Sequence, residues 1–332
     1  MTPIIDMSGV TKRFVRELDA AEKIARRLGA KVEERTVHAV EDVNLKVARG
    51  EVLGLVGESG CGKSTLGRMV AGLMTPSAGA IRFRGKDVAG LKGKDAREAA
   101  LKVQMIFQDP MSSLNPRLRV ETIVGEAPQV HGIVPRSERD AYVADMLTYV
   151  GLDPAMRRRY PHQFSGGQRQ RIGIARALAV RPDFLVCDES VAALDVSIQA
   201  QVLNLFMRLR EAFDLTYMFI SHDLGVVEHI SNRIAIMYLG RIVEEGPTEA
   251  IFGGANHPYT QALLAERPVI APGKRKFSTI KGEIPSPLSP PPGCHFHPRC
   301  PHAFARCKVE RPALKEIAPG RKSACHLNDK AA

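Results

Sequence analysis

The sequence predicts an α/β protein with a mostly parallel β-sheet. Short apolar runs at residues 52–56, 184–187 and 217–220 have the length and composition of buried strands. Residues 198–213 instead carry apolar side chains at helical spacing. Strands that alternate with helices along a chain are typical of a parallel sheet covered by helices. The first strand ends directly before a glycine-rich turn, where we look first for a functional site.

Length and composition indicate a folded protein of about two domains. The chain has 332 residues, of which 44% are hydrophobic and 25% are charged. No apolar run approaches the roughly 18 residues that are needed to cross a bilayer. Residues 1–14 lack the basic start and the apolar stretch of a signal peptide. We therefore expect a cytoplasmic protein that reaches a membrane only through a partner.

The chain is basic, with a formal net charge of +11. A basic balance favours anionic partners such as nucleotides, nucleic acid or an anionic membrane surface. The alternative is that the excess charge is spread over a solvated surface. Aromatic residues are not interleaved with Lys and Arg as they are in proteins that bind single-stranded nucleic acid, so no nucleic-acid partner is expected.

The chain divides at about residue 254. Residues 1–254 carry the alternating strand and helix patterns and predict one α/β domain. Residues 255–332 are rich in proline, lack a long periodic pattern and predict a smaller, irregular C-terminal domain. Residues 16–34 have the pattern of an amphipathic helix inserted into the first domain. We interpret it as a surface insertion packed on its own domain; docking on a partner or a membrane surface is the alternative.

The glycine-rich turn fits the eight-residue Walker A pattern and precedes a helix that begins near Lys63. Glycines let the backbone approach an anion closely, and backbone N–H groups at a helix N-terminus form an anion site. Lys63 adds a mobile positive charge, and the Ser64 hydroxyl is a hard oxygen ligand suited to Mg²⁺. The loop therefore predicts a P-loop NTPase, without saying which kind. The residues predicted to bind ATP here are Gly57, Ser59, Gly60, Cys61, Gly62, Lys63, Ser64 and Thr65.

A second anion site is predicted at Ser165, Gly166, Gly167 and Gln168, again at the start of a helix. Both sites can grip one γ-phosphate only if the second site comes from another chain. In this the sequence resembles the ABC ATPase family, in which the signature of one subunit closes over ATP held by the other. The resemblance implies the P-loop NTPase ABC ATPase fold, with a RecA-like core, an antiparallel β subdomain and a helical subdomain at about residues 110–165.

Three further motifs resemble catalytic motifs of that family. Asp188 ends a Walker B-like strand and is expected to help hold Mg²⁺. Glu189 follows it and resembles the carboxylate that orients and deprotonates the attacking water; a simple helix cap is the alternative. Gln108 matches the Q-loop, whose amide can touch both Mg²⁺ and the water.

Other family positions are matched by His222, Asp195 and Phe14. His222 matches the switch histidine that contacts the γ-phosphate. Asp195 fits the D-loop, which communicates across the dimer. Phe14 is the candidate for stacking on adenine, although a core position is the alternative. Ser190 and Ala192 depart from the common proline and serine of the family, and neither change removes a charge that catalysis needs.

The C-terminal domain narrows the resemblance. Residues 257–263, 282–287 and 293–301 are similar to sequences typical of the oligopeptide and dipeptide importer branch of ABC transporters. The resemblance implies two transmembrane permease subunits, a second ATPase subunit and a periplasmic solute-binding protein as partners. The second ATPase would be a related chain or a second copy. It also implies a location at the cytoplasmic face of the bacterial inner membrane.

Four cysteines, Cys294, Cys300, Cys307 and Cys325, lie in this proline-rich region. Four thiols in a segment with little core of its own suggest a metal staple. Their spacing is too wide for the paired Cys-x-x-Cys knuckles of most zinc sites. We expect a 4Fe–4S cluster, as related importer subunits are thought to hold; zinc and free structural thiols are the alternatives.

The sequence thus predicts an ATPase that energises import of peptides or related small solutes, with ATP and Mg²⁺ as its cofactors. A non-transport ABC protein that acts on nucleic acid or ribosomes is the alternative. Such proteins usually carry two cassettes or a long coiled-coil insertion, and this sequence has neither. A P-loop kinase would lack the signature at residues 165–168.

Overall fold

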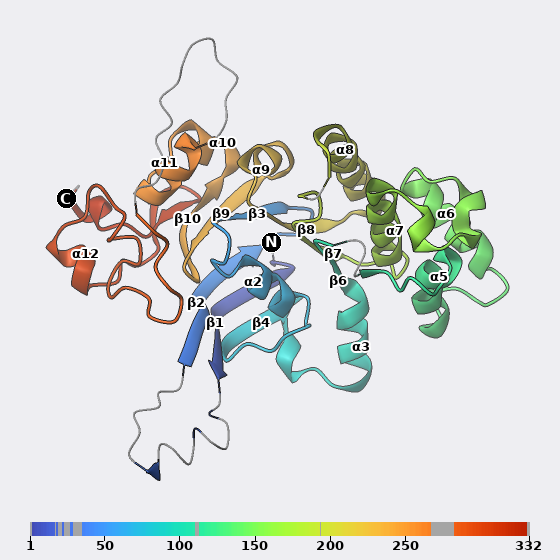
Figure 1. Ribbon diagram of the computed structural model, residues 1–332, viewed down its shortest axis with the longest axis horizontal. Helices are drawn as coiled ribbons and strands as arrows, with labels where there is room; N and C mark the ends of the chain where they lie inside the picture. Colours follow the sequence, from blue (N-terminus) through green and yellow to red (C-terminus); the bar gives the residue numbers. More distant parts are fainter. Residues whose placement is uncertain are drawn as a thin grey trace, which may run out of the picture.

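The computed structural model describes residues 2–16, 35–109, 113–192, 194–266 and 282–330, together with Leu18, Glu22, Arg27 and Leu28. Two β-sheets lie at the centre of the molecule, with helices on either side and at one end (Figure 1). No helix within these residues is both long and apolar enough to cross a membrane.

The larger sheet has eight strands in the order β11-β12-β10-β9-β3-β8-β7-β6. The strands from β9 to β6 in that order are parallel, whereas β10, β12 and β11 pair antiparallel. Strands β3, β7 and β8 are buried along their whole length, because helices cover both faces of this part of the sheet. The bounds are β3 Val52–Val56, β6 Val103–Ile106, β7 Phe184–Asp188, β8 Thr216–Ser221, β9 Arg233–Tyr238, β10 Arg241–Pro247, β11 Lys315–Ala318 and β12 Arg321–Ser323.

The smaller sheet is antiparallel, with the order β2-β1-β4-β5. Its apolar residues alternate along β1, where Ile5 and Met7 are buried. They share one core cluster with Leu55 of β3 and Leu66 of helix α2, so this sheet packs against the phosphate-loop side of the larger sheet. The bounds are β1 Ile5–Arg16, β2 Arg35–Val47, β4 Ala78–Phe83 and β5 Lys86–Asp87.

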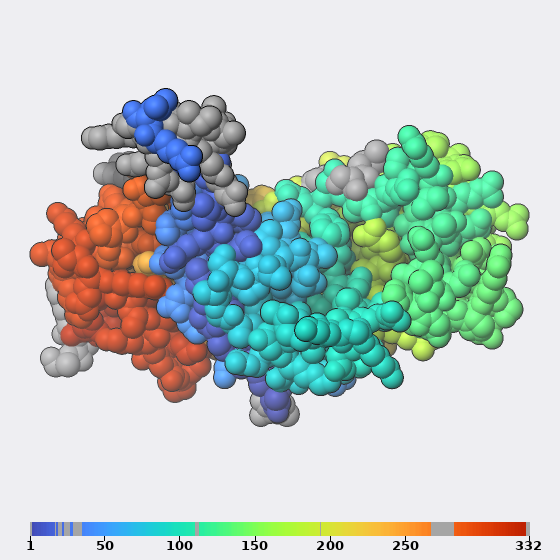
Figure 2. All heavy atoms as spheres, turned by 90° about the horizontal axis from the view of Figure 1, so that it is seen from below, coloured from blue at the N-terminus to red at the C-terminus, as the bar shows by residue number. Residues whose placement is uncertain are grey.

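Helices α5, α6 and α7 pack together through Val124, Val143 and Ile174, all fully buried. Their core is continuous with that around β7 and β8. This group lies at one end of the molecule, opposite the C-terminal segment (Figure 2). The helices before the C-terminal segment are α2 Lys63–Val70, α3 Gly93–Lys102, α5 Val120–Val130, α6 Arg139–Tyr149, α7 Gly166–Leu178, α8 Val196–Phe213, α9 Leu224–Ile230 and α10 Thr248–Gly253. Four short 3₁₀ turns are η1 Val88–Gly90, η2 Pro154–Arg158, η3 Pro161–Gln163 and η4 His326–Lys330.

The C-terminal segment, which follows α10, is built onto the larger sheet. Strand β12 pairs with β10, so the segment extends the sheet by two strands. The helices of the segment are α11 Pro258–Ala265 and α12 Ala305–Val309. Its core is aromatic: the rings of Tyr259 and Phe296 pack on Tyr238 at the end of β9, with centroids 4.6 and 5.3 Å from the Tyr238 ring.

The predicted fold class is confirmed: a parallel core, an antiparallel β subdomain, a helical subdomain and a small C-terminal unit are all present. The predicted strands match β3, β7 and β8, and the predicted helix at 198–213 matches α8. The helical insertion at residues 16–34 lies largely outside the described residues. The division at residue 254 stays a prediction.

Candidate ATP site

The candidate site lies at the carboxyl edge of the parallel strands. Strands β6, β7, β8 and β3 are adjacent and in register, so the loops that follow them meet at one edge. The glycine-rich loop follows β3, and Gln108 follows β6. Asp188 ends β7, Glu189 comes directly after it, and His222 follows β8. Carboxyl edges of parallel sheets are where ligands bind in open α/β folds.

The glycine-rich loop wraps tightly around the side chain of Lys63. The Lys63 ammonium donates hydrogen bonds to the backbone oxygens of Gly57 at 2.8 Å and Glu58 at 3.0 Å. The side chain is buried, with the residue only 4% exposed, although lysine is almost never fully buried without partners. The loop ends at Gly62, whose φ of 107° belongs to the left-handed region that favours glycine. The loop therefore encloses a positive charge at the start of α2.

Ser64 and Asp188 lie opposite each other at the base of the loop. The Ser64 hydroxyl donates to the Asp188 carboxylate at 2.8 Å. Burial raises the pKa of Asp188, because the charged carboxylate is removed from water. A hydroxyl and a partly desolvated carboxylate are the hard oxygen ligands that Mg²⁺ prefers, so these two residues fit a magnesium site.

The three side chains predicted to act in catalysis come together, with Gln108 and His222 both next to Glu189. The Gln108 side-chain amide donates to one Glu189 carboxylate oxygen at 2.7 Å. The other oxygen lies 3.3 Å from Nδ1 of His222. Glu189 itself has a φ of 45°, a left-handed conformation that is strained for a glutamate. The backbone is thus bent so that one carboxylate faces both partners.

The signature residues lie apart, at the N-terminus of α7. Ser165 and Gln168 form a capping box: the Ser165 hydroxyl accepts from the Gln168 N–H at 3.3 Å, and the Gln168 side chain accepts from the Ser165 N–H at 3.0 Å. Ser165 and Gly166 are exposed, and a Cβ on Gly166 would meet no atom within 4 Å. This helix N-terminus is therefore open to a ligand or a partner.

The remaining predicted residues are at the surface or in the loop. Phe14 on β1 is 41% exposed, with the Lys12 ammonium 5.4 Å from its ring centroid, so it is not a core residue. Asp195 is exposed directly before α8. Cys61 is buried in the loop, and burial raises the pKa of its thiol. Ser59 and Gly60 are exposed, and Thr65 lies in the first turn of α2.

The prediction of an iron–sulfur cluster is wrong. All four C-terminal cysteines lie in the part of the chain that the structure describes, and there no group of three or more His, Cys, Asp or Glu is arranged to hold a metal ion. The cysteines are free thiols, and burial raises the pKa of Cys294 to about 11. A protonated thiol behaves as a small apolar group rather than as a ligand. Cys294 and Cys300 accordingly pack against the aromatic core of the C-terminal segment.

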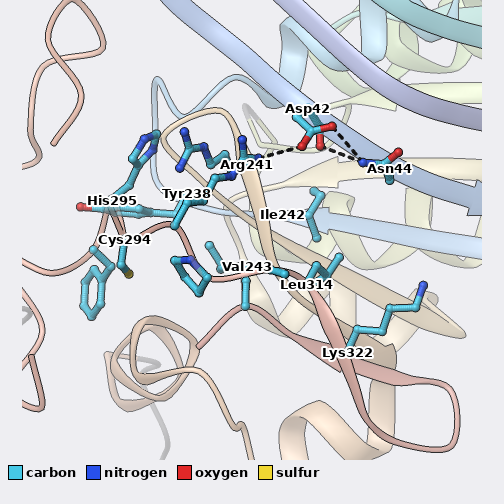
Figure 3. Close-up of a pocket in the computed structure, with 15 residues that line it drawn as sticks. Asp42, Asn44, Tyr238, Arg241, Ile242, Val243, Cys294, His295, Leu314 and Lys322 are labelled. Carbon is cyan, nitrogen blue, oxygen red and sulfur yellow. Dashed lines mark hydrogen bonds and ion pairs between the residues drawn. The ribbon is translucent and has the colours of Figure 1, made fainter. Parts of the chain in front are cut away.

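A cavity of about 510 Å³ lies between β2, the β9–β10 pair and the C-terminal segment (Figure 3). Its lining includes none of the residues predicted to bind ATP. The charged groups around it are paired across the boundary: Arg311 lies 3.2 Å from Asp42, and Lys322 lies 2.6 Å from Glu245. These ion pairs hold the C-terminal segment against both sheets.

Three residues that contact the site were not predicted from the sequence: Glu58, Tyr259 and Arg299. Glu58 is a variable position of the Walker A pattern, and the other two lie far along the chain. The sequence did single out the regions of two of them. Tyr259 and Arg299 belong to the C-terminal sequences at 257–263 and 293–301 that resemble the importer branch.

A glycine-rich loop at the edge of a parallel core, a helical subdomain that carries its own exposed glycine-rich helix N-terminus, and an antiparallel sheet beside them define an ABC-type P-loop ATPase. Comparison with known proteins supports the same class. Residues 40–192 match the family model described as ABC transporter, and residues 243–307 match the C-terminal region of oligopeptide/dipeptide transporters. The chain belongs to the ATP-binding proteins of the ABC transporter family.

Curated relatives are similar over most of the chain. A probable peptide ABC transporter ATP-binding protein, y4tS of Sinorhizobium fredii, is 50% identical over 89% of this chain and 84% of its own length. The oligopeptide transport ATP-binding protein AppF of Bacillus subtilis is 50% identical over 88% of this chain and 90% of its own. A putative peptide import ATP-binding protein of Brucella ovis is 45% identical over 98% of both chains.

Solved structures share the fold. The ATP-binding cassette MJ0796, in a dimeric post-hydrolysis state bound to ADP and Pi, superposes with a TM-score of 0.62 at 27% identity. The match covers 74% of this chain and 98% of that one. The protein cbiO1 of Clostridium perfringens, part of the ABC transporter complex cbiONQ, has the same TM-score of 0.62 at 24% identity. That match covers 76% of this chain and 91% of the other, and it supports the fold alone.

Proposed function

We propose that this protein binds and hydrolyses ATP to drive import of peptides, or of related small solutes, through a membrane transporter. The observation that carries the proposal is the convergence of Gln108 and His222 on Glu189, next to the Lys63 loop. Peptide as the substrate class is supported by the match over residues 243–307 and by the names of the relatives.

In this proposal Lys63 and the loop N–H groups hold the β- and γ-phosphates. Ser64 and Asp188 would hold Mg²⁺, which supplies positive charge to the phosphate oxygens when it is bound. Gln108 and His222 hold the Glu189 carboxylate, which orients a water and takes its proton as the water oxygen attacks the γ-phosphorus. The bond from that phosphorus to ADP breaks. Phe14, exposed on β1, is the proposed contact of the adenine ring.

A second ATPase subunit completes the site in this proposal. The signature residues Ser165, Gly166, Gly167 and Gln168 stand at an open helix N-terminus, where they can receive the γ-phosphate of ATP held by a partner. Asp195, exposed at the start of α8, is the proposed communication residue across this interface. The partner is a related chain or a second copy.

Each of two permease subunits would dock on one ATPase subunit, in the groove between the larger sheet and the helical subdomain. A hollow of about 420 Å³ lies there, lined by apolar residues such as Leu91 and Phe107 and by Arg176 of α7. Phe107 directly precedes Gln108, so a partner helix seated in the groove would contact the chain beside the catalytic group. In this proposal the protein works on the cytoplasmic face of a bacterial inner membrane, and a periplasmic solute-binding protein delivers the substrate.

The test of the ATPase assignment is Glu189→Gln. The amide keeps the size of the side chain and removes the base. We expect ATP binding to be retained, ATP-dependent dimers to persist, and kcat to fall by about 100-fold or more. Steady-state phosphate release and size-exclusion chromatography with and without ATP measure the three effects.

The matched control is Glu211→Gln on the exposed face of α8, which we expect to leave kcat unchanged. Normal turnover by Glu189→Gln would contradict its role as the base. The transport assignment is tested by co-purification with permease subunits from the source cells and by ATP-driven peptide uptake into proteoliposomes. Recovery of RNA in place of permeases would favour the nucleic-acid alternative.

A further inference from the structure

One buried arginine joins the C-terminal segment to the phosphate loop. The two terminal nitrogens of the Arg299 guanidinium donate to the two carboxylate oxygens of Glu58 at 2.8 and 2.9 Å. The Arg299 side chain is 5% exposed and that of Glu58 19%. Paired, parallel hydrogen bonds of this kind combine charge with fixed geometry and are the strong form of an ion pair. The two residues are 241 positions apart, so only the tertiary fold brings them together.

A second residue of the segment holds the backbone of the same loop position. The Glu58 N–H donates to the Tyr259 hydroxyl at 3.0 Å. Tyr259 is fully buried, and its ring packs with Phe296, at a centroid distance of 5.4 Å. Arg299 also stands over the ring of Tyr238, 5.9 Å from its centroid. Glu58 is thus fixed through both its backbone and its side chain by a rigid aromatic cluster.

The loop is also fixed from the side of β9. A Cβ on Gly57 would lie 2.1 Å from the backbone oxygen of Met237, so the loop backbone lies directly against the end of that strand. The Gly240 N–H donates to the Cys61 carbonyl at 2.9 Å. Because Tyr259 and Arg299 also hold Glu58, the first half of the loop has little freedom to change its backbone conformation.

The negative charge of Glu58 is unfavourable in a loop that is to bind phosphates. It lies in the loop whose N–H groups are to hold phosphates, and a free carboxylate there would repel them. Arg299 neutralises that charge and turns the carboxylate towards the C-terminal segment. Because Arg299 is buried, its attraction to Glu58 is weakly screened by water and salt. A carboxylate released from this pair would oppose phosphate binding and leave the loop less ordered.

We propose that Arg299, together with Tyr259, is a positioning residue of the ATP site that sets nucleotide affinity by holding and neutralising Glu58. The C-terminal segment is then part of the nucleotide site rather than an appendage of the cassette. This inference rests on the proposed function, since it requires ATP to bind at this loop. It concerns affinity and leaves the chemistry at Glu189 untouched.

The test is Arg299→Gln in the full chain, with KM for ATP and kcat measured at several salt concentrations. We expect KM to rise by about tenfold, as a like charge near the phosphates predicts, and kcat to stay within about twofold. The increase in KM should shrink as salt rises, because salt screens the repulsion between the unpaired Glu58 carboxylate and the phosphates.

Rescue separates positioning from folding. Adding Glu58→Gln to Arg299→Gln removes the uncompensated charge, so we expect KM to return to within about threefold of the original value. A residue needed only for folding would not be rescued, because the double variant lacks the ion pair as well. Tyr259→Phe is a milder variant that keeps the ring and removes the hydroxyl; we expect a KM increase of about threefold.

Arg321→Gln is the matched control. Arg321 pairs with the buried Glu244 of β10 at 2.9 Å and so ties the same segment to the sheet without touching the loop. We expect a lower melting temperature and an unchanged KM. If Arg299→Gln behaves like this control, or if Glu58→Gln fails to restore affinity, the proposal is overturned. Absence of ATP binding by the unmodified chain would overturn the proposed function too, so the two failures are distinguishable.

Discussion

The side chain of Ser64 has two possible partners, and only one of them is within the chain. In the structure its hydroxyl donates to Asp188 at 2.8 Å. A bound Mg²⁺ would need the lone pairs of both groups, so this hydrogen bond keeps the two ligands close until the cation arrives. The raised pKa of Asp188 has burial as its main cause, and a cation would offset that cost by stabilising the charged carboxylate.

Ser64→Ala should therefore act on magnesium rather than on nucleotide. We expect the Mg²⁺ concentration for half-maximal ATPase activity to rise by about tenfold or more, because one hard oxygen ligand is lost. Binding of ATP without Mg²⁺ should be nearly unchanged. Magnesium titrations of phosphate release measure the first effect and equilibrium nucleotide binding the second.

Ser77→Ala is the control for Ser64→Ala, since the Ser77 hydroxyl is hydrogen-bonded to the backbone of Arg13 in the antiparallel sheet rather than to Asp188. It should leave the magnesium dependence unaltered. An unchanged magnesium requirement in Ser64→Ala would rule out Ser64 as a ligand.

At the scale of elements, the phosphate loop depends on how closely β3, β2 and α2 approach one another. Gly62 ends the loop with a φ of 107°, and a Cβ there would lie 2.1 Å from the backbone oxygen of Ala39 on β2. Gly60 in the same loop has a φ of 78° but no atom within 4 Å of its Cβ position. Both glycines need a left-handed backbone, and only Gly62 also needs the space.

Gly62→Ala should lower the free energy of unfolding by about 3 kcal/mol or more, because backbone strain adds to a clash with main-chain atoms that cannot move alone. Gly60→Ala should cost about 1 kcal/mol, from strain only. Urea unfolding followed by circular dichroism gives both values. Equal costs for the two variants would mean that β2 does not restrict the loop.

At the scale of the whole molecule, the C-terminal segment is held by buried neutral histidines as well as by ion pairs. His257 is 1% exposed, and its Nδ1 accepts a hydrogen bond from the Tyr259 N–H at 3.0 Å. Burial lowers the pKa of His257 to about 4, although the nearby Glu244 acts in the opposite direction. The pKa of His295 is also lowered to about 4, first by burial and then by the positive charge of Arg241.

The C-terminal segment should therefore loosen in acid. Above pH 6.5 both histidines are neutral in the folded and unfolded chain, so they impose no penalty. Between pH 6.5 and about 4 the unfolded chain takes up protons first, and stability falls by up to about 3 kcal/mol for each histidine. The melting temperature measured from pH 7.5 to 5 should fall accordingly.

His257→Asn keeps a hydrogen-bond acceptor for the helix start and removes the titrating ring. It should reduce the pH dependence of the melting temperature by about half, with His295 responsible for the rest, even if it lowers that temperature at pH 7.5. His131→Asn, at the exposed end of α5, should leave the pH dependence as it is. A slope that is the same in all three proteins would exclude the buried histidine as its source.

Much of the fold could be predicted from local sequence. The runs at β3, β7 and β8 are continuously apolar because those strands are covered on both faces, and this leaves a clear pattern. The C-terminal segment is different. Strands β11 and β12 have four and three residues and are partly exposed, so their pattern is too short and too polar to be recognised.

The site also has parts that local sequence predicts and parts that it does not. Walker A, the signature and the residues after β6, β7 and β8 are short local motifs, because each is a turn with one backbone geometry. The cysteines show the opposite case. Their number suggested a cluster, but a ligand set is a matter of three-dimensional arrangement. In the folded segment the four cysteines are free thiols, of which Cys307 is buried and the other three are partly buried.

The sequence by itself determined the class of protein, an ABC-type ATPase, through a Walker A loop at one helix N-terminus and a signature sequence at another. These features are encoded by neighbouring residues, so they can be read without the fold. Only the tertiary structure decided that Glu189 meets Gln108 and His222, and that Arg299 reaches Glu58. Contacts between distant residues depend on how sheets and segments pack, and no local pattern records them.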